Sequence, residues 1–176
     1  MSGDQQRVGL KTLSPWIAGA SFHIGISVPD LQTAMDFYVG LLGFEEVWRK
    51  TDVDMAAVSG VQGLREKTLV QLLVPGGSRI EFQEFDPPGP VKERALSDVG
   101  LNHLSFGVDD IHAEYNRLKA AGVEFLSEPL ELDFGPGDVL TGWSVVYFKD
   151  PWGLTLELLG PTPGFEGQVD DDERRP

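Results

Sequence analysis

The stretch FHIGISVPD at residues 22–30 is repeated with small changes as NHLSFGVDD at residues 102–110. In each copy, a histidine stands in a segment of alternating apolar residues, and an acidic residue follows where a helix can begin. Alternating apolar residues predict a half-buried strand, and an acidic N-cap predicts the start of a helix. The repetition therefore indicates a duplicated unit that begins with a strand and continues into a helix.

The remainder of each unit follows the same order of elements. In the first unit, the pattern predicts a helix at 31–42 and strands at 20–28, 44–50, 67–74 and 78–85. In the second unit, it predicts a helix at 110–121 and strands at 101–108, 123–126, 142–149 and 153–159. Segment 52–65 has no clear pattern, and 127–141 is expected to be a long loop that could cover a site.

A four-stranded sheet with one helix cannot bury both of its faces alone. We therefore predict an α+β fold in which two βαβββ modules pair into a curved half-barrel sheet around a cleft, with the helices outside. The expected division is an N-terminal extension at 1–18, a first module at 19–90, a second module at 99–161, and an acidic, disordered tail at 162–176.

Composition restricts the classes of partner. The chain has 176 residues and a net charge of −14, which disfavours binding to nucleic acid or to anionic membranes. It has no cysteine, so disulfides and thiolate chemistry are excluded. No secretory signal pattern and no long apolar run is present, so cytoplasmic residence is expected.

Each module also repeats a histidine and a glutamate at matching points. The intervals are 81 − 23 = 58 residues from His23 to Glu81 and 157 − 103 = 54 residues from His103 to Glu157. Strand periodicity places each of these side chains on the polar face of its strand, away from the apolar residues that face the helices. Two imidazoles and two carboxylates suit a divalent ion such as Zn, Mn, Co, Ni or Fe(II), with open positions for a substrate oxygen. Four unrelated polar residues on strands are the competing interpretation, and the repetition argues against it.

These motifs, together with FKDPWGLTLEL at 148–158, resemble the vicinal oxygen chelate superfamily, which includes glyoxalase I, methylmalonyl-CoA epimerase, fosfomycin-resistance proteins, extradiol dioxygenases and bleomycin-binding proteins. The resemblance covers about residues 19–161. It implies paired βαβββ modules, and metal ligands at the positions of His23, Glu81, His103 and Glu157. Because bleomycin-binding members usually lack this ligand set, its completeness favours an enzyme.

The stretch QGLREKTL at 62–69 resembles a segment of some methylmalonyl-CoA epimerases. The resemblance implies that Glu66 is a second acid/base group opposite Glu157. Such epimerases often have Gln at the position of Glu81, whereas glyoxalase I enzymes commonly have Glu there. The competing interpretation of Glu66 is a solvated carboxylate at a strand edge, next to Arg65 and Lys67.

The function expected from these features is a divalent-metal-dependent isomerase, epimerase or lyase that stabilises the enolate of a small carbonyl or thioester substrate, with Glu157 and Glu66 as acid/base groups. An Fe(II) extradiol-type dioxygenase and a metal-free small-molecule binding or resistance protein are the alternatives. A homodimer is the expected assembly, with the site either within one chain or across two. Arg79 could hold a substrate carboxylate or form an ion pair, and Gln83 could hydrogen-bond a ligand residue.

Overall fold

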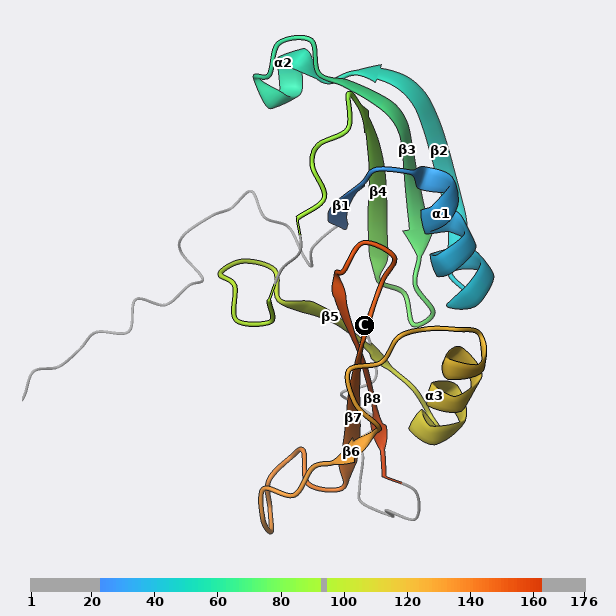
Figure 1. Cartoon of the computed structure of the whole chain (residues 1–176), viewed down its shortest axis with the longest axis vertical. Coiled ribbons are helices and arrows are strands. Elements are labelled where there is room, and N and C mark those ends of the chain that lie inside the picture. The colour runs from blue at the N-terminus through green and yellow to red at the C-terminus, as the bar shows by residue number, and fades with distance from the viewer. Residues whose placement is uncertain (1–22, 93–94, 163–176) are drawn as a thin grey trace, which may run out of the picture.

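The computed structural model of the chain describes residues 23–92 and 95–162, which form two four-stranded sheets (Figure 1). The first sheet contains β1 (Ile24–Val28), β2 (Glu45–Asp54), β3 (Arg65–Leu73) and β4 (Arg79–Asp86). The second contains β5 (His103–Gly107), β6 (Leu130–Glu131), β7 (Trp143–Lys149) and β8 (Thr155–Pro161). The strand orders, β1-β4-β3-β2 and β5-β8-β7-β6, are the same arrangement built twice.

Within each sheet, the first strand of the module runs parallel to the last, and the other neighbours are antiparallel. The parallel pair places the start of the module beside its final strand. A histidine and a glutamate 54 to 58 residues apart in the chain thereby become neighbours. The predicted α+β fold with two βαβββ modules is confirmed, and neither sheet closes into a barrel.

The helices begin where the sequence predicts. In α1 (Leu31–Met35), Asp30 Oδ1 accepts a hydrogen bond from the Thr33 amide at 2.7 Å. In α3 (Ile111–Ala120), Asp110 Oδ1 accepts one from the Ala113 amide at 2.9 Å. Each N-cap satisfies an amide that has no partner within its helix. The first helix continues as a π-helical turn, η2 (Asp36–Leu41), so the predicted helix at 31–42 is present but changes its winding half-way.

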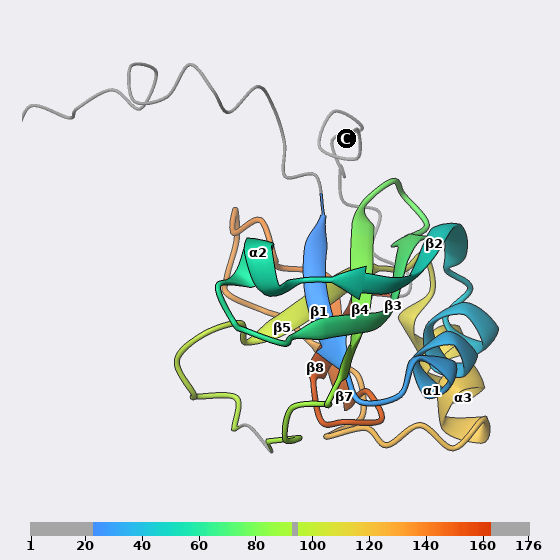
Figure 2. The same ribbon diagram turned by 90° about the horizontal axis from the view of Figure 1, so that it is seen from above.

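The helices α1 and α3 lie on the same side of the molecule in both views (Figures 1 and 2). A single apolar cluster joins the two modules there. Phe44 and Phe106 contact each other edge to face across the junction, with ring centroids 5.4 Å apart. The Tyr38 hydroxyl donates a buried hydrogen bond of 3.0 Å to Asp150 Oδ2 in the turn between β7 and β8. The modules are therefore held together through the layer that contains the helices.

Two segments differ from the expected pattern. The predicted strand at 123–126 forms only an isolated bridge, Phe125 to Phe148, because Phe125 turns inward to pack on Tyr115 and Phe148. The fourth strand of the second sheet is instead β6, within the segment expected to be a loop. Segment 52–65 contains the end of β2 and a short helix, α2 (Ala56–Ser59).

The predicted extension at 1–18 and the tail beyond residue 162 lie outside the described residues. Within the described ranges, no helix is long and apolar enough to span a membrane.

Candidate functional site

The first predicted ligand pair lies where β1 and β4 run side by side. Gly25 stands opposite Glu81 in the parallel register, and His23 is on the same face of the chain two residues earlier. His23 Nε2 is 3.5 Å from Glu81 Oε1. The two side chains are 34% and 11% exposed, so the imidazole is accessible and the carboxylate is largely covered.

The second pair repeats this arrangement on β5 and β8. Ser105 stands opposite Glu157, and His103 Nε2 is 3.6 Å from Glu157 Oε2. The exposed fractions of the two side chains, 32% and 11%, nearly equal those of the first pair. The duplicated sequence has therefore produced two geometrically equivalent His–Glu pairs.

Two further side chains contact the second pair. His103 Nδ1 lies 2.6 Å from Asn102 Oδ1. If Nδ1 carries the proton and donates to that amide oxygen, Nε2 has a lone pair directed toward Glu157, which is the tautomer that binds a metal. The Tyr147 ring contacts His103 edge to face at 5.3 Å. Burial raises the pKa of the Tyr147 hydroxyl, and a hydrogen bond to the Glu157 carboxylate adds to the effect.

The four predicted ligands do not meet in one place. Among residues 23–92 and 95–162, no group of three or more His, Asp or Glu side chains is arranged to hold a metal ion. Each sheet instead presents one imidazole nitrogen and one carboxylate oxygen next to each other. This donor set fits half of the coordination sphere of a borderline divalent ion such as Zn, Mn, Co, Ni or Fe(II).

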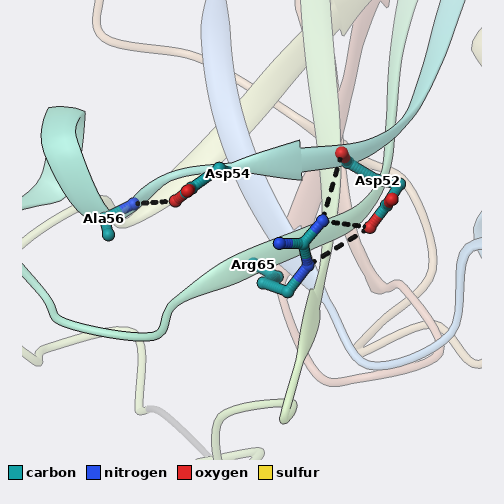
Figure 3. Close-up of polar contacts among 4 residues, drawn as sticks. All are labelled: Asp52, Asp54, Ala56 and Arg65. Carbon is teal, nitrogen blue, oxygen red and sulfur yellow. Dashed lines mark hydrogen bonds and ion pairs between the residues drawn. The ribbon is translucent and has the colours of Figure 1, made fainter.

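Glu66 on β3 is not a solvated carboxylate at a strand edge. Its side chain is completely buried, and neither of its carboxylate oxygens has a hydrogen-bond partner. The two neighbouring cations point elsewhere. Arg65 pairs with Asp52 across the β2–β3 hairpin (Figure 3), and Lys67 donates to Glu84 Oε1 at 2.8 Å. Its complete burial excludes the interpretation of Glu66 as a solvated carboxylate.

Glu66 lies on the same face of the first sheet as the ligand pair. It is opposite Phe85 in the β3–β4 register, and Phe85, Gln83 and Glu81 alternate along one face of β4. Burial raises the pKa of Glu66, the nearby Gln83 side chain lowers it in part, and the negative charge of Glu81 raises it again. A carboxyl whose pKa is raised in this way is better suited to act as a general acid.

The close-up of the hairpin in Figure 3 shows how the chain beyond β2 is held. Asp54 Oδ1 accepts a hydrogen bond of 2.9 Å from the Ala56 amide at the start of α2. Asp52 adopts a left-handed backbone conformation with φ of 58° and contacts the Arg65 guanidinium. These local contacts fix the turn that leads directly into Glu66.

Two cavities border the paired strands. One, of about 290 Å³, lies along the edge of β1 and is lined in part by Gly25, Ser27, Phe85 and Trp152. The other, of about 570 Å³, borders the edge of β5 and is lined in part by His103 and Ser105 together with Arg79 of the first sheet. Phe85 and Trp152 thus line a cavity. The third histidine, His112, is exposed on α3, away from both pairs.

Two polar residues of the site were not singled out from the sequence. Asn102 precedes His103 and contacts its ring, and its position directly before a predicted ligand was the signal available. Gln71 is fully buried opposite Glu81 on the neighbouring strand. Its position becomes evident only once the register of β3 against β4 is known.

Comparisons with known proteins show the family to which the chain belongs. The family model described as the glyoxalase/bleomycin resistance protein/dioxygenase superfamily matches residues 21–158. The chain belongs to this superfamily. A 2-epi-5-epi-valiolone epimerase from Actinomyces sp. is 32% identical, over 87% of this chain and 86% of its own length. The mitochondrial methylmalonyl-CoA epimerase of Homo sapiens is 29% identical, over 89% of this chain and 82% of its own length.

Solved structures of superfamily members share the fold. A glyoxalase family protein from Bacillus cereus superposes with a TM-score of 0.68 at 21% identity, covering 81% of this chain and 93% of its own. The fosfomycin resistance protein FosX from Listeria monocytogenes, in a complex with Mn(II) and sulfate, gives a TM-score of 0.53 at 23% identity, over 84% and 95% of the two chains. The predicted membership of the superfamily is confirmed, and epimerases are among its relatives.

Proposed function

We propose that this protein is a divalent-metal-dependent epimerase or isomerase, which removes and returns a proton next to the carbonyl group of a small ketone or thioester. The observation that carries the proposal is Glu66, a buried carboxyl without a partner on the same sheet face as His23 and Glu81. A buried, unsatisfied carboxyl costs roughly 1–3 kcal/mol or more. Such a cost is typical of a group retained for its chemistry rather than for stability.

The ligands of the metal would be His23 and Glu81 from the first module, and His103 and Glu157 from the second. The bound ion would polarise the substrate carbonyl and stabilise the enolate. The chain's own groups carry the proton. Glu157 lies beside an accessible imidazole and is suited to remove it, and Glu66 is suited to deliver one from the other sheet.

The two carboxyl groups lie in different environments, which suits them to opposite steps of the proton transfer. Glu66 is buried without a partner, whereas Glu157 neighbours His103 and Tyr147. Carboxyl groups on opposite sides of a planar enolate permit inversion at the carbon, which is epimerisation. The names of the valiolone and methylmalonyl-CoA epimerases among the relatives support this reaction class over a lyase or dioxygenase.

We further propose that each complete site forms between two copies of the chain. One chain offers two equivalent half-sites on separate sheets, and these do not meet within the described residues. In a two-fold symmetric dimer, the His23–Glu81 pair of one copy can face the His103–Glu157 pair of the other. The symmetry then repeats the same contact, so that two identical sites close at once.

Mixing two inactive variants tests this arrangement by metal content alone. In a shared-site dimer, a His23→Ala chain paired with a His103→Ala chain has one site that lacks both imidazoles and one that is intact. After random subunit exchange, half of the dimers are mixed, so we expect about a quarter of the wild-type metal per chain. Each variant alone should bind little metal. A mixture that binds no more metal than the separate variants would refute the shared site.

The reaction itself is tested by solvent exchange. Metal-loaded protein in D₂O should incorporate deuterium at the acidic carbon of an enolisable thioester or ketone. Glu66→Gln should slow this exchange by about 10²-fold or more, in the range of general acid–base contributions. Glu84→Gln is the matched control, because Glu84 lies in the same strand pair but on the opposite face, paired with Lys67. Absence of exchange with every enolisable compound tested, in protein that holds stoichiometric metal, would refute the proposed function.

A further inference from the structure

The larger cavity, on the edge of β5, has a predicted metal ligand in its wall and is otherwise mostly apolar. It has a volume of about 570 Å³ and is lined by residues of both modules. His103 and Ser105 line it from β5, and Ser105 stands opposite Glu157 in the parallel register. Because the His103 side chain is 32% exposed, a molecule in the cavity can contact the imidazole. The cavity therefore adjoins the His103–Glu157 pair.

The remaining wall consists largely of apolar side chains. Ile24, Leu42 and Val74 line the cavity from the first module, and Leu101 and Phe106 line it from the second. The turn between β3 and β4, which extends toward β5 and α3, forms part of the same wall (Figure 1). Ile24 and Leu101 are 40% and 45% exposed, although both are large and apolar. An apolar ligand group would remove this surface from water, which is favourable.

The charged side chains in the described wall, Arg79 and Glu114, already have partners. Arg79 donates to Gln71 Oε1 at 2.7 Å. Glu114 on α3 forms an ion pair with Arg117. A charged ligand group would compete with these contacts and would have to leave water, whereas an apolar group would disturb neither. The wall therefore favours a neutral, apolar group.

We propose that this cavity binds a neutral, apolar substituent of the substrate, whose carbonyl group reacts next to His103. The inference rests on the proposed function for the position of that carbonyl group. The volume of about 570 Å³ is in the usual range for small-molecule sites, and at about 30 Å³ for each small group it holds on the order of ten non-hydrogen atoms. A methyl group would leave most of this space to water beside apolar walls. The substrate class is therefore a carbonyl compound with a straight or cyclic hydrocarbon substituent of about six to ten carbons, rather than a short or polyhydroxylated one.

Binding of a homologous series tests the cavity without measuring turnover. Straight-chain alkyl hydroxamates of about two, four, six, eight and ten carbons are titrated calorimetrically into Mn(II)-loaded protein, because the headgroup binds the ion and only the chain length varies. We expect the affinity to rise roughly 3-fold with each added methylene up to about eight carbons, since each methylene leaves water. The heat-capacity change of binding should become more negative over the same range. Primary alcohols of the same lengths, titrated into metal-free protein, should show the same increment.

Ser78→Trp narrows the cavity, because Ser78 is an exposed residue of its wall in the turn between β3 and β4. It should weaken binding of the eight-carbon probe roughly 10-fold, while binding of the two-carbon probe and the metal content stay unchanged. Val58→Trp is the matched control, since Val58 is 79% exposed on α2 and does not line the cavity. It should bind every probe like the wild type.

Affinities that do not change with chain length would overturn the proposal, as would an equal effect of Ser78→Trp and Val58→Trp. A wild-type dimer that Ser78→Trp dissociates, with no effect of chain length, would instead assign the cavity to contact with a second copy of the chain. Absence of solvent exchange would refute the proposed function alone, because the alcohol series in metal-free protein reports on the cavity independently of the reaction.

Discussion

Replacing Glu66 by glutamine should increase stability while it lowers activity. The Glu66 side chain is completely buried, and both of its oxygens lack partners. Its pKa in the folded protein is raised above the usual value of 4.5, first by burial. A carboxyl with a raised folded pKa favours folding when it is protonated, and that contribution is lost as the pH rises from the unfolded pKa to the folded one. The ionised form of Glu66 therefore destabilises the fold.

The magnitude follows from the cost of an unpaired buried carboxyl, roughly 1–3 kcal/mol. The neutral amide of Glu66→Gln has nearly the same size and avoids the penalty on the ionised form. At pH 7.5 we expect the variant to be more stable by about 1–2 kcal/mol, which corresponds to a rise in Tm of roughly 2–8 °C for a domain of this size. As the pH falls through 4.5, the advantage should shrink toward zero, because Glu66 then becomes protonated in the unfolded as well as the folded state.

The assay is urea unfolding of both proteins at pH 7.5, 6 and 4.5, with their metal removed so that ligand binding does not contribute. Glu84→Gln provides the comparison, because Glu84 is a buried glutamate that accepts from Lys67, and its loss should destabilise the protein. This account of Glu66 is contradicted if Glu66→Gln is less stable than the wild type at pH 7.5, or if its gain in stability is the same at every pH.

Three further predictions concern single contacts. Tyr38→Phe should lower the free energy of unfolding by about 1–3 kcal/mol, because it removes the buried hydrogen bond to Asp150 that joins the modules; thermal melting measures it. Asn102→Ala should weaken metal affinity roughly 10- to 100-fold by freeing the His103 ring, as measured by competition with a chelator, and unchanged affinity would contradict that role. Gly160→Ala should cost about 1–3 kcal/mol, since its Cβ would lie 2.6 Å from a backbone carbonyl oxygen; a variant as stable as wild type in urea would show that the strand can shift.

The sequence predicted most of the fold because its signals are local. In 22–30 and 102–110, the alternation of polar and apolar residues predicts strands with one polar and one apolar face. Asp30 and Asp110 begin the helices, and both caps are present in the structure. The segments that were missed lack such signals. In 123–126, Phe125 packs inward on two aromatic rings, and the segment forms only a single bridge instead of the backbone hydrogen bonds of a strand.

The amino-acid sequence alone shows that the protein is a duplication, and that each copy contains one histidine and one glutamate at equivalent points. This follows from the period of two in a strand and from the repeat, neither of which depends on distant contacts. How these residues meet depends on the way the two modules pack together. The tertiary structure brings them together as two separate pairs, because the modules join through their helices. It also buries Glu66 and Gln71 completely, since burial and strand register arise from long-range packing that no local pattern records.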